Sequence, residues 1–142
     1  MKFPIPAEAD TAELARRIAV ELRPGVPVLL RGPLGSGKTF FARAAIRALA
    51  GGLVEIPSPS FSLLQTYDSP AGAISHYDLY RLKNADEVFE LDFDAALREN
   101  ITLIEWPEIV EDYIKANFAY VEIVFSEENG KRTAEITRTT IP

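Results

Sequence analysis

The chain contains no cysteine, and this absence excludes disulfide bonds and thiolate metal sites. It has no apolar run near the ~20 residues that a membrane-spanning helix needs. Its first residues include a lysine but not the apolar stretch of a signal peptide. From these absences we expect a cytoplasmic protein that does not associate with the membrane.

Positive charge is also scarce: 15 Lys and Arg stand against 21 Asp and Glu, which gives a net charge of −6 at pH 7. Nucleic-acid binding generally depends on a positive surface, and no basic cluster stands out along the chain. We therefore expect no strong direct binding to nucleic acid, and a protein partner fits better. The length of 142 residues predicts a single domain, residues 1–142.

What the sequence does contain is a complete phosphate-binding loop, residues 32–39, Gly-Pro-Leu-Gly-Ser-Gly-Lys-Thr. This run matches the pattern G-x-x-x-x-G-K-[ST], in which glycines let successive backbone N–H groups point at an anion. Lys38 can then reach the β- and γ-phosphates, and the Thr39 hydroxyl can bind Mg²⁺. The loop predicts a nucleoside triphosphate with Mg²⁺ as the ligand.

The surroundings of the loop have the required strand–loop–helix order. Residues 26–31 are rich in aliphatic and β-branched residues, which favours a buried strand. Residues 40–50 have helical spacing and end at two glycines, as a helix with a glycine cap does. Upstream, Asp10 and Glu13 resemble a capping box, with Asp10 as N-cap of a helix that runs to about Leu22.

The rest of the chain predicts two hairpins, a buried strand and further helices. The hairpins are expected at 61–67 with 73–79, and at 120–126 with 132–139, where Asn129-Gly130 suits a type I′ turn. Residues 84–100 and 108–116 are expected to be helical, and 101–106 to be a strand. The sum is an α/β fold with a parallel strand pair near the loop and antiparallel additions.

Two acids are candidates for the rest of the site. Glu105 follows the apolar run 101–104, and ligand sites of open α/β sheets lie beyond the carboxyl ends of the strands. It is therefore expected to face the metal or its water, the alternative being a salt bridge at the sheet edge. Asp78 could bind Mg²⁺ or orient the attacking water, but it could equally cap a turn.

Other polar residues have a functional and a plain interpretation. Ser60 could contact the γ-phosphate or be an ordinary loop serine, and Arg81 could neutralise a phosphate or be solvated. Trp106 could cover the nucleotide or fill the edge of the core. The lone His76 suits a satisfied core or rim position better than catalysis, and Arg132 suits a charged hairpin tip.

Taken together, the segments 34–39, 58–61, 76–81 and 104–108 resemble the TsaE (YjeE) family in order and spacing. The segments His-Tyr-Asp-Leu-Tyr-Arg and Glu-Trp are more specific than the loop itself. The resemblance implies a P-loop ATPase of three layers with a mixed, mainly parallel central sheet and antiparallel hairpins. It further implies a role in making threonylcarbamoyladenosine (t6A) in tRNA, with the transferase subunit TsaD and its paralogue TsaB as partners.

The resemblance also implies roles for individual residues. Lys38, Asp78 and Glu105 would be catalytic, and Thr39 and Glu105 would bind the metal. The nucleotide contacts would be Thr11, Gly35, Ser36, Gly37, Lys38, Thr39, Phe40, Ser60 and Arg132. The chain departs from the family where Pro33 replaces a usual Asp and Ser60 a usual Thr, and neither change removes a needed donor.

Two other functions stay open at this point. A small-molecule kinase could use the same loop, although 142 residues leave little room for an acceptor pocket and a lid. A non-catalytic scaffold could use bound ATP only to hold subunits together. A GTPase is disfavoured because residues 83–86, Lys-Asn-Ala-Asp, have the wrong order for a guanine-reading segment.

Overall fold

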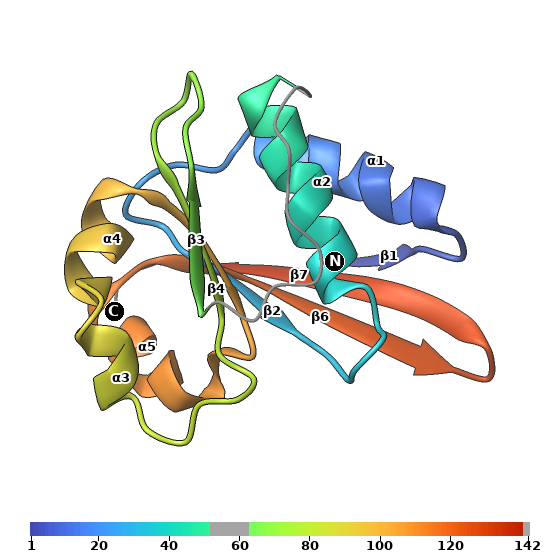
Figure 1. The fold of residues 1–142 in the computed structure, drawn as a ribbon. Helices are drawn as coiled ribbons and strands as arrows, with labels where there is room; N and C mark the ends of the chain where they lie inside the picture. Colours follow the sequence, from blue (N-terminus) through green and yellow to red (C-terminus); the bar gives the residue numbers. More distant parts are fainter. Residues whose placement is uncertain (52–62, 141–142) are drawn as a thin grey trace.

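The computed structural model describes residues 1–51 and 63–140, and its strands form one seven-stranded sheet (Figure 1). The sheet order is β1-β7-β6-β2-β5-β4-β3. Strands β6, β2, β5 and β4 are mutually parallel, while β3, β7 and β1 pair antiparallel at the edges. The strands are β1 (Lys2–Pro4), β2 (Val28–Arg31), β3 (Leu64–Tyr67), β4 (Ile74–Asp78), β5 (Ile101–Glu105), β6 (Tyr120–Glu128) and β7 (Lys131–Thr139).

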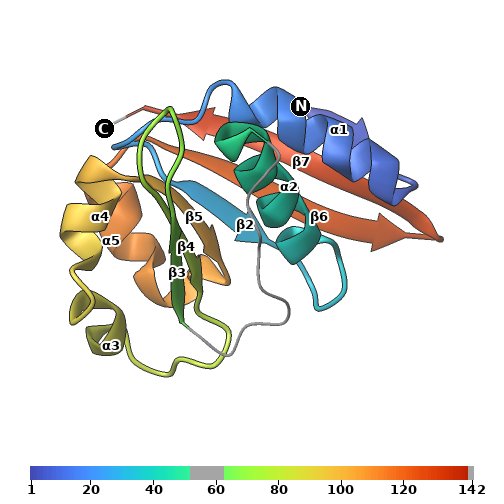
Figure 2. The same ribbon diagram turned by 45° about the horizontal axis from the view of Figure 1, so that its top comes forward.

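Helices cover both faces of this sheet, which gives three layers (Figure 2). Helices α1 (Glu8–Ala19) and α2 (Lys38–Ala50) pack on one face. The other face carries α3 (Asp86–Phe89), α4 (Phe93–Glu99), a 3₁₀ turn (Pro107–Val110) and α5 (Glu111–Asn117). Side chains alternate along β2, so Val28 and Leu30 join the core under α1 and α2, whereas Leu29 joins the other core. The predicted mixed α/β sandwich is confirmed.

The local elements around the loop agree with the sequence. Strand β2 precedes it, α2 follows it, and α2 ends at Gly51 in the left-handed conformation with φ of 85°. At the second hairpin, Asn129 and Gly130 both have positive φ, which confirms the predicted turn. The first hairpin is also present as β3 and β4, although residues 61–62 of its prediction lie outside the described residues.

Three of the helical predictions differ most from the structure. Helix α1 begins at Glu8 and ends at Ala19, so Asp10 is its third residue, and the Asp10 carboxylate accepts a hydrogen bond from the Ala7 N–H at 3.0 Å. The region 84–100 is two short helices, because Asp92 adopts a left-handed conformation between them. Residues 107–110 form a 3₁₀ turn before α5 rather than part of a longer helix.

Strand β1 was not predicted, because it is only three residues long and depends on pairing with β7. No helix in the described part of the chain is long and apolar enough to cross a membrane.

Candidate nucleotide-binding site

The phosphate-binding loop leaves the central strand β2 and enters α2, whose first residue is Lys38. Gly32 opens the loop with φ of 149°, and a Cβ at this position would lie 2.7 Å from Ser36 Oγ and 2.8 Å from the Phe125 carbonyl oxygen. Only glycine fits there, since its backbone is free at this φ and it lacks a Cβ. The tight packing of Gly32 against β6 therefore determines how the loop leaves the sheet.

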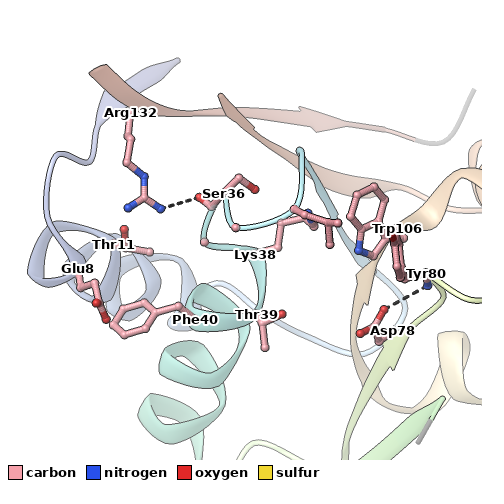
Figure 3. A pocket seen from close by; sticks show the side chains of 13 residues that line it. Glu8, Thr11, Ser36, Lys38, Thr39, Phe40, Asp78, Tyr80, Trp106 and Arg132 are labelled. Carbon is pink, nitrogen blue, oxygen red and sulfur yellow. Dashed lines mark hydrogen bonds between the residues drawn. The ribbon is translucent and has the colours of Figure 1, made fainter. Parts of the chain in front are cut away.

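The loop forms one wall of a cleft of about 430 Å³. Figure 3 shows that side chains from α1, α2, β7 and the ends of β4 and β5 surround this cleft. The lining residues are Glu8, Thr11, Leu34, Gly35, Ser36, Gly37, Lys38, Thr39, Phe40, Asp78, Tyr80, Trp106 and Arg132. Of the candidate residues, Glu105 is buried behind this lining, and Ser60 lies outside the described residues.

Thr39 and Glu105, 66 positions apart in the chain, meet at the head of the loop. The Thr39 hydroxyl donates to Glu105 Oε1 at 2.5 Å, and Glu105 Oε2 lies 2.7 Å from His76 Nε2. Burial opposes ionisation of Glu105. The hydrogen bonds from His76 and Thr39 and the charge of Lys38 outweigh that effect, so the pKa of Glu105 lies below its ordinary value. Glu105 is therefore held as a carboxylate.

The Lys38 ammonium is held by the loop and by an aromatic ring. Its Nζ donates to the carbonyl oxygens of Gly32 at 2.5 Å and Pro33 at 2.9 Å, and lies 3.9 Å from the centroid of the Trp106 ring. Burial lowers the pKa of Lys38, against the attraction of Glu105 and Asp78. A cation over an indole face is a favourable contact, so Trp106 forms part of the wall of the site.

Asp78 lies beside Glu105 because β4 and β5 are in parallel register, with Asp78 opposite Glu105. Its Oδ1 accepts a hydrogen bond from the Tyr80 N–H at 3.1 Å. Burial is the main reason that the pKa of Asp78 is raised, and the charge of Glu105 adds to it. The two acids therefore differ: Glu105 is held ionised, whereas Asp78 takes up a proton more readily.

Arg132 reaches the loop from the start of β7. Its guanidinium donates to the Ser36 carbonyl oxygen at 2.9 Å and lies 3.1 Å from where a Cβ on Gly37 would be (Figure 3). The sequence favoured a charged hairpin tip for this residue, and the structure places it on the loop instead. Lys131, its neighbour, is exposed.

Three lining residues were not singled out from the sequence. Tyr80 follows Asp78 by two positions and packs on Trp106 with ring centroids 4.8 Å apart. Leu34 is a variable position of the loop. Glu8 precedes the predicted helix but is the first residue of α1 in the structure, and from there its side chain lines the cleft.

The oxygen donors at Thr39 and Glu105 suit a hard divalent cation such as Mg²⁺. Among the described residues, no group of three or more His, Cys, Asp or Glu side chains is arranged to hold a metal ion. A Mg²⁺ ion here would need further oxygens from phosphates and water, as in other phosphate-binding loops.

The family model described as "Threonylcarbamoyl adenosine biosynthesis protein TsaE" matches residues 5–136. The chain is 44% identical over 130 residues to the "tRNA threonylcarbamoyladenosine biosynthesis protein TsaE" of Rickettsia felis, covering 92% of this chain and 76% of the relative. The protein of that name from Aquifex aeolicus is 35% identical, with 93% of this chain and 92% of the relative covered.

A solved structure shares the fold. The crystal structure of Bacillus subtilis YdiB superposes with a TM-score of 0.74 and 25% sequence identity. The match covers 100% of this chain and 86% of the other.

Proposed function

Because the chain belongs to the TsaE family, we propose that it is a Mg²⁺-dependent ATPase that takes part in the synthesis of threonylcarbamoyladenosine in tRNA. Its ATP binding and hydrolysis would regulate the threonylcarbamoyl-transferase complex of TsaD and TsaB in the cytoplasm. The observation that carries the ATPase proposal is the 2.5 Å contact between the Thr39 hydroxyl and the Glu105 carboxylate at the head of the loop.

In the proposed mechanism, Lys38 contacts the β- and γ-phosphates and stabilises the charge that develops during transfer to water. Thr39 and Glu105 would hold the cation, which would supply positive charge to offset the negative charge of the phosphates. Arg132 and the backbone N–H groups of residues 35–40 position the phosphates, and Thr11 and Phe40 line the same cleft.

We assign metal binding to Glu105 and orientation of the attacking water to Asp78. Glu105 uses one carboxylate oxygen for Thr39 and the other for His76, so its orientation is fixed and its charge is maintained. Asp78 uses Oδ1 for the Tyr80 N–H, and burial raises its pKa towards that of a group able to accept a proton.

The test is ATP turnover by the protein alone and with purified TsaD and TsaB. Wild type should be stimulated by the partners. Lys38→Ala should lose turnover by roughly 10²–10³-fold, the cost of removing one preorganised charge-stabilising group. Lys83→Ala, at an exposed position, is the matched control and should behave as wild type.

Wild-type turnover in Lys38→Ala would refute the ATPase proposal. Tight ATP binding without turnover, alone or with the partners, would replace it with the scaffold function. Transfer of phosphate to a small acceptor in a substrate screen would replace it with a kinase.

A further inference from the structure

Arg31 is the last residue of β2 and immediately precedes the phosphate-binding loop. Its side chain is only 17% exposed and contacts three carboxylates: Glu111 at 2.7 Å, Glu122 at 3.1 Å and Glu108 at 3.3 Å. One cation therefore pairs with three acids from three different elements, the 3₁₀ turn, α5 and β6. Arg31 itself does not line the cleft.

The turn that Arg31 holds is the one that presents Trp106. Trp106 directly precedes the 3₁₀ turn and has a left-handed backbone, φ of 55° and ψ of 58°. Such a conformation is strained for a non-glycine residue and persists only when its surroundings enforce it. Its N–H donates to the Leu30 carbonyl at 3.3 Å, one residue before Arg31.

The ring of Trp106 lies over the Lys38 ammonium and packs against the ring of Tyr80 (Figure 3). The connection from Arg31 to Lys38 thus runs through the residues 106–111. Removing the Arg31 charge would leave Glu108, Glu111 and Glu122 close to one another, with Lys115 still paired to Glu111. Their repulsion would act to move the 106–111 segment away from the end of β2.

We propose that Arg31 is a positioning residue for the nucleotide cleft: by pairing with Glu108, Glu111 and Glu122, it keeps the turn after β5 against β2 and so keeps Trp106 over Lys38. The consequence for nucleotide affinity rests on the proposed function. The placement of Trp106 does not, and it can be measured without nucleotide.

Trp106 is the only tryptophan of the chain, so its fluorescence reports this placement directly. In Arg31→Gln, we expect the emission maximum to shift to longer wavelength and acrylamide quenching to increase in the nucleotide-free protein. Affinity for MgATP, measured by calorimetry, should fall about tenfold, equivalent to ~1.4 kcal/mol.

Two further variants separate positioning from general stability. In Arg31→Gln combined with Glu108→Gln and Glu111→Gln, the repulsion is gone, and both emission and affinity should return towards wild type. Arg138→Gln removes a two-bond ion pair with Glu21 on the α1 side of the protein, so it should alter stability without changing Trp106 emission.

Wild-type emission and affinity in a folded Arg31→Gln would overturn the proposal, as would failure of the combined variant to restore either. If Arg31→Gln does not fold, Arg31→Lys decides, because it keeps the charge but cannot reach three carboxylates. A shift of the Trp106 emission maximum to longer wavelength in Arg31→Lys then supports the proposal, and an unchanged emission maximum overturns it. Absence of MgATP binding in wild type would instead refute the proposed function. The emission measurement on the nucleotide-free protein would still test the role of Arg31.

Discussion

Replacing Gly32 with alanine should lower the free energy of unfolding by about 4 kcal/mol. At φ of 149°, a residue with a Cβ pays of order 1–3 kcal/mol in backbone strain. The Cβ would also lie 2.8 Å from the Phe125 carbonyl oxygen, and overpacking of this kind costs typically 1–3 kcal/mol. The Ser36 hydroxyl can rotate away from the new group, but the Phe125 carbonyl belongs to a paired strand and cannot.

Thermal unfolding measures the effect. A loss of ~1 kcal/mol lowers the unfolding midpoint by roughly 2–4 °C in a domain near this size, so Gly32→Ala should lower it by about 8–16 °C. The control is Gly51→Ala, at φ of 85° with nothing within 4 Å of the new Cβ. This variant should lose only the free energy of placing an alanine in the left-handed conformation, roughly 1–2 kcal/mol. If the two variants unfold within a few degrees of each other, the close contact between the loop and β6 does not limit this position.

Two further predictions concern the acids at the strand ends. Thr39→Val removes the hydroxyl that donates to Glu105, so the Mg²⁺ concentration for half-maximal ATP turnover should rise about tenfold. Thr39→Ser should stay near wild type, and equal Mg²⁺ requirements in the two variants would contradict the assignment. Asp78→Asn should abolish turnover yet raise the unfolding midpoint at neutral pH, because burial raises the pKa of Asp78 and its charged form destabilises the native state. That cost is absent below the unfolded pKa of about 3.9 and grows as the pH rises from there towards the raised native pKa. The gain in midpoint should therefore be larger at neutral pH than in acid, and an equal gain at both would point to packing instead.

The elements that could be predicted are those with a local pattern. Strand β2, the loop, α2 and its Gly51 cap follow from residues next to one another in the chain. The start of α1 could not be predicted, because Asp10 is equally suited to the N-cap and to the third helical position. With Asp10 as N-cap, Glu13 would be the third residue of a capping box. With Asp10 as the third helical residue, as in the structure, its carboxylate accepts the hydrogen bond from the Ala7 N–H instead.

For the site, the acids could be predicted but not what holds them. Their place at the ends of buried strands indicated that Asp78 and Glu105 meet. That His76 bonds Glu105, or that Arg31 gathers three carboxylates, depends on the register of strands far apart in the sequence. The register between such strands cannot be predicted from the residue pattern of any one segment.

The position of β2 has a consequence for synthesis of the protein. Both of its neighbours come later in the chain, β5 at residues 101–105 and β6 at residues 120–128. Arg132, which bonds Ser36, comes later still. A ribosome-bound chain that ends before these residues therefore contains the whole phosphate-binding loop without the strands on either side of it. Non-local pairing of this kind is slow to form, so we expect the nucleotide site to assemble only after residue 132 has left the ribosome, long after the phosphate-binding loop itself has been translated.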